Sequence, residues 1–436
     1  MKADRYFAVV DCDNCYVSCE RVFRPDLRDK PVVVLSNNDG CVVARSNEAK
    51  RMGIKAGMPY FQLAQQFPDQ KIAVFSSNYE LYGDLTARVM SIISKESPRY
   101  FRYSIDEAFV MLDGLRPDEL KAWGEHLHKR IKRDVGMPVS IGIAPCKTLA
   151  KVASHYAKHF SGYRHCCVID TDEKRRKALA SYPVDEVWGI GRRYSARLAK
   201  NDIRTALAFA DREEAWVRTA FNNVTILRTW QELNGADSVP NEEPAKKQSI
   251  CVSRSFPKLV GDFDIIKRYV SNYAARCSEK LRRQNSSASV VGVFLSTNPF
   301  REDLPQYGNF AETKLLTPSN ASFTIVEKAT ECLEKVFQKG FLYKKAGVVV
   351  ISMDNAAGLQ TNLLDFDAEQ FEKLKRLDEV IDRINKREGG ETVILASQQF
   401  PGKAPEGKNL QFADAIRHDF KSPNYTTRWS DIIELK

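Results

Sequence analysis

Short apolar runs alternate with longer amphipathic stretches over residues 1–170. A continuous apolar run bounded by polar residues is typical of a buried strand, and such runs predict strands over residues 7–11, 30–35, 100–105, 108–112 and 139–144. Apolar residues three and four positions apart predict helices over residues 14–22, 78–94, 117–133 and 147–158. Strands that alternate with helices in this way indicate a sheet covered by helices.

The pattern changes after residue 170. Residues 171–245 have only helical spacing and end in a Gly- and Pro-containing linker over residues 234–244. Residues 246–352 then predict a βαββαβ order, with strands over 249–256, 289–297, 310–316 and 344–352 and helices over 263–283 and 321–339. A charged helix is predicted over residues 368–386. The chain is therefore expected to form at least three units.

No predicted segment suits a membrane or a secretory signal. The apolar stretch from Ala346 to Met353 falls well short of the roughly 20 residues of a spanning helix. Asp11 interrupts the only apolar run near the N-terminus. We expect a cytoplasmic protein, and its ten scattered cysteines are then expected to be reduced thiols.

Positive charge is concentrated in one part of the chain. The 436 residues carry a net charge of +10, and residues 246–352 alone contribute 17 basic and 9 acidic residues. Such a block favours binding to nucleic-acid phosphates, although a merely soluble basic surface is the alternative.

Three carboxylates stand at predicted strand ends. Asp11 ends the first strand, and Asp106 and Glu107 lie at the bend between two later strands. If these strands are neighbours, a cluster of hard oxygen ligands suits Mg²⁺ better than zinc. Two ions about 4 Å apart could then assist phosphoryl transfer. Solvated turn residues are the alternative.

Two other groups raise a weaker possibility of a metal site. One is Cys12, Cys15 and Cys19, for which small buried thiols are the simpler interpretation. The other comprises His155, His159, His165, Cys166 and Cys167.

Three segments resemble the motifs of Y-family translesion DNA polymerases. They are DCDNCYVSCE at residues 11–20, YSIDEAF at 103–109, and SIGIA at 140–144 followed by KTLAK at 147–151. The UmuC branch of the family is indicated by VVLSNNDGCVVA at 33–44, FSSNY at 75–79, VWGIGRR at 187–193 and YTTR at 425–428. The resemblance runs from residue 6 to about residue 352, with islands beyond.

The resemblance implies an α+β, multidomain right-hand polymerase. The palm would comprise residues 1–30 and 81–170, the fingers 31–80, the helical thumb 171–245 and the little finger 246–352. Residues 353–436 would form a partner-binding tail. The implied function is error-prone synthesis across damaged DNA in the SOS response, without a proofreading exonuclease.

The resemblance also implies roles for single residues. Asp11, Asp106 and Glu107 would hold two Mg²⁺ ions, and the Cys12 carbonyl would assist. Lys158 matches the lysine that contacts the dNTP triphosphate. Tyr16 matches the steric gate, an aromatic ring beneath C2′ of the incoming sugar.

Two positions depart from the family pattern. A common Tyr-x-x-Arg motif of the fingers is here Asn47 and Lys50, and lysine cannot form the bidentate contact of arginine. Arg45 is a possible compensation that the sequence leaves open. Cys15 replaces an aromatic residue before the gate, so the sugar pocket is expected to be roomier.

Candidate contacts to DNA and partners lie further along the chain. Gly189 and Gly191, with Arg192 and Arg193, resemble a helix-hairpin-helix element that binds the DNA backbone through amides and positive charge. Arg254 is a candidate DNA contact in the basic block. Gln360, Leu363 and Leu364 resemble a sliding-clamp peptide.

By resemblance, the tail receives a UmuD-type accessory dimer and the recombinase RecA. The substrates would be damaged primer–template DNA and dNTPs. Two other functions are weighed against this one: a catalytically silent DNA-binding scaffold, and another palm-fold nucleotidyl enzyme such as a cyclase. Intact carboxylates argue against the first, and the basic block argues against the second.

Overall fold

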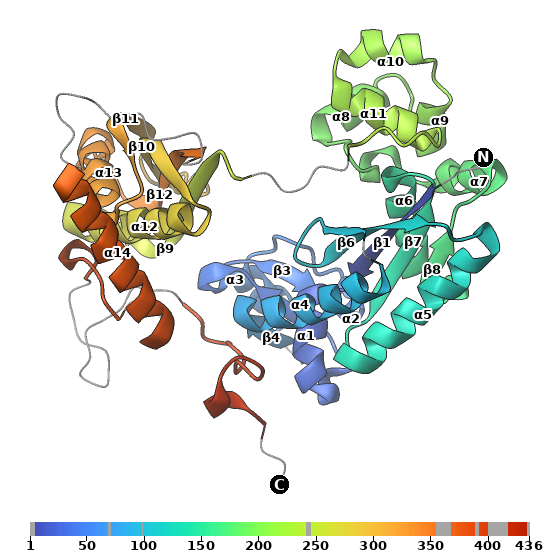
Figure 1. Ribbon diagram of the computed structural model, residues 1–436, viewed down its shortest axis with the longest axis horizontal. Helices are drawn as coiled ribbons and strands as arrows, with labels where there is room; N and C mark the ends of the chain where they lie inside the picture. The colour runs from blue at the N-terminus through green and yellow to red at the C-terminus, as the bar shows by residue number, and fades with distance from the viewer. Residues whose placement is uncertain are drawn as a thin grey trace. The chain divides into compact units, whose positions relative to one another are not determined.

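The computed structural model describes residues 5–68, 71–97, 99–240, 246–354, 368–388, 392–399 and 417–433. The chain divides into two compact units, one of residues 1–243 with 418–436 and the other of residues 244–417. Figure 1 shows both units.

A five-stranded sheet forms the centre of the first unit, in the order β5-β6-β1-β7-β8. Its strands are β1 (Arg5–Cys12), β5 (Tyr100–Arg102), β6 (Glu107–Asp113), β7 (Val139–Ala144) and β8 (Cys166–Val168). β1 runs antiparallel to both β6 and β7, so it lies in the middle of the sheet. The predicted strand over residues 100–105 is shorter in the structure and ends at Arg102.

Helices cover this sheet on both faces (Figure 1). They are α1 (Cys15–Phe23), α4 (Tyr79–Glu96), α5 (Pro117–Val135) and α6 (Lys147–His159). Successive side chains of a strand point to opposite faces, and Ala8 and Val10 accordingly pack in the core with α1, α4 and α5. Phe7 and Val9 pack in the core with α6. Burial on both faces explains why β1 is continuously apolar.

A three-stranded sheet carries the small subdomain that follows α1. Its order is β3-β2-β4, with β2 (Val32–Leu35) antiparallel to β3 (Val42–Arg45) and parallel to β4 (Ala73–Ser76). The helices are α2 (Asn47–Arg51) and α3 (Tyr60–Gln66). The sequence pattern predicted only the first of these strands.

Residues 171–240 are helical, as predicted, apart from short turns. The helices are α7 (Asp172–Ser181), α8 (Arg192–Ala199), α9 (Ala206–Ala210), α10 (Glu214–Phe221) and α11 (Val224–Leu233). They share the core of α6. Glu232 is buried on α11 and joins this helix to α6. It accepts hydrogen bonds from the backbone amide and the hydroxyl of Thr148 on α6, at 2.7 and 2.6 Å.

The second unit confirms the predicted βαββαβ order. Its antiparallel sheet, ordered β11-β10-β12-β9, comprises β9 (Ser249–Val260), β10 (Ser286–Thr297), β11 (Gly308–Ser319) and β12 (Tyr343–Asp354). The helices α12 (Phe263–Arg283) and α13 (Ser322–Val336) share its core. A further helix, α14 (Ala368–Glu388), is bound to α12 by a bidentate pair between Arg282 and Asp382, with both distances at 2.7 Å.

The two described ends of the tail belong to different units. The helix α14 belongs to the second unit, whereas residues 418–433 belong to the first. The amide of Asp419 donates to Asp39 at 2.8 Å, and the amide of Phe420 donates to Ser76 at 3.0 Å. Among the described residues, no helix is long and apolar enough to cross a membrane.

Candidate active site

The strand register brings the predicted catalytic carboxylates together. Asp11 on β1 is the direct cross-strand partner of Glu107 on β6. Asp106 immediately precedes β6, and its carbonyl accepts a hydrogen bond from the amide of Cys12 at 3.0 Å. All three carboxylates therefore lie at one end of the central strands, as the sequence predicted.

Ser104 shapes the bend that carries Asp106 and Glu107. Its hydroxyl oxygen accepts hydrogen bonds from the amides of Asp106 and Glu107 at 3.2 and 3.0 Å, and its hydroxyl donates to the Asp106 carboxylate. The Glu107 carbonyl in turn accepts hydrogen bonds from the amides of Tyr103 and Ser104 at 3.0 and 3.2 Å, so the Ser104 side chain and the backbone together close the bend.

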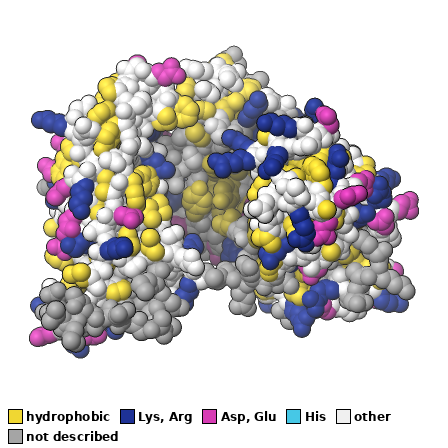
Figure 2. Space-filling model, turned by 90° about the horizontal axis from the view of Figure 1, so that it is seen from above, with side chains coloured by type: hydrophobic (Ala, Val, Ile, Leu, Met, Phe, Trp, Pro, Cys, Tyr) yellow, Lys and Arg dark blue, Asp and Glu magenta, His cyan; other side chains and the backbone are white. Residues whose placement is uncertain are grey.

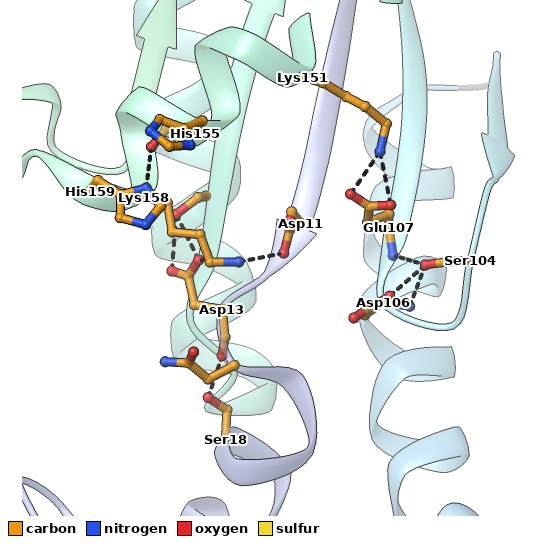
Figure 3. A network of polar contacts seen from close by, with 12 residues as sticks. Asp11, Asp13, Ser18, Ser104, Asp106, Glu107, Lys151, His155, Lys158 and His159 are labelled. Atoms are coloured by element: carbon orange, nitrogen blue, oxygen red, sulfur yellow. Dashed lines mark hydrogen bonds and ion pairs between the residues drawn. The ribbon is translucent and has the colours of Figure 1, made fainter. Parts of the chain in front are cut away.

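Two lysines of α6 neutralise the cluster (Figure 3). Lys158 donates to Asp11 at 3.0 Å and lies 3.6 Å from Asp13. Lys151 contacts both oxygens of Glu107 at 3.0 Å. Burial raises the pKa of Asp11 to about 6, and Lys158 opposes the rise. Burial alone would lower the pKa of Lys158, but Asp11 and Asp13 raise it, so this lysine stays charged.

A cavity of about 430 Å³ opens beside this cluster. Its lining includes every residue predicted to bind metal or nucleotide: Asp11, Cys12, Tyr16, Arg45, Lys50, Asp106, Glu107 and Lys158. These residues come from both sheets of the first unit and from the helices α1, α2 and α6. The cavity is thus lined by carboxylates, cations and an aromatic ring.

A second cavity of about 270 Å³ shares Asp11, Glu107 and Lys158 with the first. Its other lining residues include Lys151, His155 and Trp188. The Lys151 ammonium lies 4.7 Å from the ring centre of Tyr103 and 5.5 Å from that of Trp188. Asp11 and Glu107 therefore line both cavities, whereas Asp106 lines only the larger one.

Residues of the small subdomain line the larger cavity beside the cluster. Lys50 on α2 donates to Asn14 at 2.7 Å. Asn14, in turn, donates to Asn47 at 3.1 Å. The Arg45 guanidinium donates to the carbonyl of Ile54 at 2.8 Å. Burial is the main cause that lowers the pKa of Lys50, and the positive charges of Lys158 and Arg45 lower it further.

Tyr16 on α1 is half-buried at the cavity wall. Its ring stacks on Tyr82 with a centroid separation of 4.7 Å and an interplanar angle of 14°. The edge of Tyr79 approaches it at 5.7 Å. Burial raises the pKa of Tyr16 to about 12, so its hydroxyl is neutral at ordinary pH.

The Gly-x-Gly segment precedes helix α8, as the sequence predicted. Gly189 has a φ of +93°, and a Cβ atom there would lie 2.5 Å from the Thr229 hydroxyl, so this position requires glycine. Gly191 is the N-cap of α8, open space surrounds its Cα, and Arg192 and Arg193 are exposed. The adjacent Trp188 indole donates to Tyr103 at 3.1 Å, which links this segment to the bend of the carboxylates.

Basic side chains are exposed on both units in Figure 2, with acidic side chains among them. Arg254 lies on β9 opposite Ala346 and is only partly exposed. The clamp-like residues Gln360, Leu363 and Leu364 lie outside the described residues.

The three carboxylates fit Mg²⁺ in chemistry and in strand register. As the side chains are placed, no three His, Cys, Asp or Glu groups converge on one ion within the described part of the chain. Neither Cys12, Cys15 and Cys19 nor the group around His155 therefore forms a metal site among the described residues. Asp11 and Glu107 instead turn toward their lysines (Figure 3). Carboxylate oxygens are the ligands that Mg²⁺ prefers, and a divalent cation that binds together with substrate could replace the lysine ammonium groups at Asp11 and Glu107.

The sequence analysis missed four residues that shape the site. Lys151 binds Glu107, Ser104 forms the bend, Asn14 orients Lys50, and Asp13 contacts Lys158. All four lie in or beside the quoted motifs, but the roles of Lys151, Asn14 and Asp13 depend on contacts with distant residues, and that of Ser104 depends on the geometry of its own turn.

Comparisons with known proteins agree with this architecture. The impB/mucB/samB family matches residues 10–155, its C-terminal domain matches residues 247–363, and a domain of unknown function matches residues 375–435. The protein UmuC of Salmonella typhimurium is 40% identical over 99% of this chain and 100% of its own length. The protein MucB of Escherichia coli is 36% identical over 98% of both chains.

A solved Y-family DNA polymerase chimera shares the fold. It superimposes with a TM-score of 0.63 at 20% identity, over 82% of this chain and 100% of its own. The fold and the full-length relatives together define a DNA-directed DNA polymerase with palm, fingers, thumb and little finger, and the chain belongs to the Y family. Within that family it is a UmuC-like translesion polymerase, so the predicted family, fold class and enzyme class are confirmed.

Proposed function

We propose that the chain extends primers across damaged template bases by nucleotidyl transfer at Asp11, Asp106 and Glu107, with two Mg²⁺ ions. One observation carries this proposal: the three carboxylates, Tyr16 and the cations of α2 and α6 all line one cavity of about 430 Å³. No other described cavity combines these groups.

The cavity provides a place for each part of a dNTP. Lys158, Lys50 and Arg45 supply positive charge for the triphosphate. Lys158 already binds a carboxylate oxygen at 3.0 Å, so its ammonium group can exchange that oxygen for a phosphate oxygen. Tyr16 offers a flat ring to the sugar, and a 2′-hydroxyl would clash with it.

The smaller cavity suits the primer terminus. It adjoins Asp11 and Glu107 from the side of Trp188, next to the glycine segment of the thumb. Bound Mg²⁺ would favour ionisation of the 3′-hydroxyl and stabilise charge on the leaving phosphate. Asp11 and Glu107, cross-strand partners on β1 and β6, line both cavities, so both openings adjoin the same two carboxylates.

Other parts of the chain would hold DNA and partners. The N-terminus of α8, with its two exposed arginines, suits the DNA backbone. The little finger carries most of the excess positive charge. We further propose that the tail receives a UmuD-type dimer and a RecA filament and that residues 360–364 bind the sliding clamp. These partners would place the enzyme in the SOS response, in the cytoplasm and at DNA.

A lesion-bypass assay tests the proposal. Purified protein, with the accessory partners supplied, should extend a primer past a single damaged template base only when Mg²⁺ is present. The matched negative control is Asp106→Asn, and Asp113→Asn, an exposed carboxylate at the far end of β6, is the positive control. Bypass that persists in Asp106→Asn would contradict the proposed site, and DNA binding without any extension by the native protein would favour a scaffold.

A further inference from the structure

The C-terminal segment 418–433 packs directly against α1, the helix that carries Tyr16. The Ser422 hydroxyl donates to Glu20 at 3.0 Å, and Glu20 lies one helical turn after Tyr16 on α1. Tyr425 of the same segment stacks on Phe23 at the end of α1, with ring centres 4.5 Å apart. A segment more than 400 residues away in sequence therefore holds the helix of the sugar pocket.

Tyr82 on α4 connects this contact to the gate ring itself. It is fully buried, and its hydroxyl donates to the same Glu20 oxygen at 2.6 Å. Its ring is the one on which Tyr16 stacks, at 4.7 Å and 14°. Ser422 and Tyr82 thus meet at one buried carboxylate, and the Tyr82 ring supports the back of Tyr16.

Exclusion of a ribonucleotide by a clash depends on how firmly the clashing ring is held. An aromatic ring that can shift by a fraction of an ångström admits the extra oxygen, because the surrounding contacts relax. Tyr16 is only half-buried, and two neighbouring rings hold its ring, the stacked Tyr82 and the edge of Tyr79 at 5.7 Å. The stacked Tyr82 ring, fixed at its hydroxyl, supplies that stiffness.

We propose that Tyr82, Glu20 and Ser422 are positioning residues that set the sugar discrimination of Tyr16. The proposal rests on the proposed function, in which Tyr16 excludes ribonucleotides. It gives the C-terminal segment a part in the active site, although the segment does not line either cavity.

The test measures incorporation efficiency for dNTPs and rNTPs in four full-length variants. Tyr82→Phe removes only the hydroxyl and keeps the stacked ring. Ser422→Ala removes the hydroxyl that donates to Glu20 and that also accepts a hydrogen bond from the Asn78 amide. The hydrogen bond from Asn78 to the Ser422 carbonyl remains. Ser76→Ala is the matched control, because it removes a hydroxyl that accepts from the same segment at Phe420 without touching Glu20. Tyr16→Ala removes the gate.

We expect Tyr82→Phe and Ser422→Ala each to lower the dNTP-to-rNTP efficiency ratio about three- to ten-fold, the range that one hydrogen bond represents. Ser76→Ala should leave the ratio close to that of the native enzyme. A merely structural role would lower both efficiencies together and leave the ratio unchanged, and melting temperatures measured alongside show how far each variant is destabilised.

The outcomes separate the two proposals. If Tyr16→Ala raises rNTP incorporation while Tyr82→Phe and Ser422→Ala keep the native ratio, the positioning role is wrong and the gate assignment stands. An equal fall in Ser76→Ala would also overturn the positioning role, because docking of the segment alone would then explain the effect. If Tyr16→Ala keeps the native ratio, the gate assignment fails and the positioning role fails with it.

Discussion

Asp11 and Glu107 carry like charges at directly opposite positions of neighbouring strands, an arrangement that destabilises a sheet unless cations compensate. Lys151 and Lys158 provide the compensation from one helix, where a spacing of seven residues places them two turns apart on the same side. The two lysines thus offset the repulsion between the carboxylates at this end of the sheet without bound metal.

The buried carboxyl of Glu20 is expected to make the free energy of unfolding depend on pH. Burial raises its pKa from the ordinary 4.5 to about 7, with hydrogen bonds from Tyr82 and Ser422 and the charge of Arg24 opposing the rise. A carboxyl whose pKa is raised by folding stabilises the protein fully below its ordinary pKa and loses that contribution as the pH rises through about 7. The difference amounts to at most about 3 kcal/mol.

Glu20→Gln keeps an acceptor for Tyr82 but cannot ionise. We therefore expect its free energy of unfolding to fall less than that of the native protein between pH 5 and pH 8. Chemical denaturation at both pH values measures this, with Glu334→Gln, an exposed position on α13, as the control that should follow the native protein. Parallel curves for Glu20→Gln and the native protein would show that Glu20 is ionised at no cost in the folded state.

At the scale of elements, the approach of β7 to α6 fixes where both lysines point. A Cβ atom on Gly142 would lie 2.1 Å from the carbonyl oxygen of Ala150 and from the amide nitrogen of Ser154, both on the α6 backbone. Backbone cannot move aside as a flexible side chain can. The helix therefore packs this closely only because the strand has glycine there.

Gly142→Ala should consequently destabilise the protein by more than the 1–3 kcal/mol that is roughly typical of overpacking. Gly83→Ala provides the matched control, since Gly83 lies within α4 with nothing near its Cα, and alanine there should stabilise by about 0.5–1 kcal/mol. Thermal unfolding of the two variants measures both effects. A Gly142→Ala protein as stable as the native one would mean that β7 and α6 can separate without cost.

Long helices with a regular spacing of apolar residues were predictable from the sequence. Short strands that exist only because they pair with a neighbouring strand were not. The helix predicted over residues 263–283 has the same bounds as α12. The four-residue strands β3 and β4 were missed because pairing with β2, rather than their own pattern, makes them strands. The contact of Lys151 with Glu107 spans 44 residues, and the docking of Ser422 on Glu20 spans 402. Periodicity contains no information on either.

At the scale of the whole molecule, chemistry and DNA affinity are expected to depend on separate groups. The carboxylates lie in the first unit, whereas residues 246–352 carry 17 basic and 9 acidic residues. The thumb adds Arg192 and Arg193 at the start of α8. Affinity for primer–template DNA should therefore fall steeply with salt concentration.

The double variant Arg192→Ala/Arg193→Ala tests how much the start of α8 contributes to the salt dependence of DNA affinity. Each lost phosphate contact reduces the slope of log affinity against log salt by about 0.9, so the slope should become shallower by up to about 1.8. Arg176→Ala is the control, because this exposed thumb arginine is already paired with Asp211 at 2.8 Å. Fluorescence anisotropy across a salt series measures the slopes, and equal slopes for all three proteins would remove α8 from the DNA interface.

The most direct test of the central claim is single-turnover primer extension at saturating DNA and dNTP, with DNA affinity measured on the same preparations. Asp11→Asn should lose at least about a thousand-fold in rate, since the carboxylates proposed to hold the metal ions would serve the chemical step, and should bind primer–template within a few-fold of the native protein. Asp113→Asn should match the native rate. An Asp11→Asn enzyme that extends primers at the native rate, with normal DNA affinity, would show that the reaction takes place elsewhere.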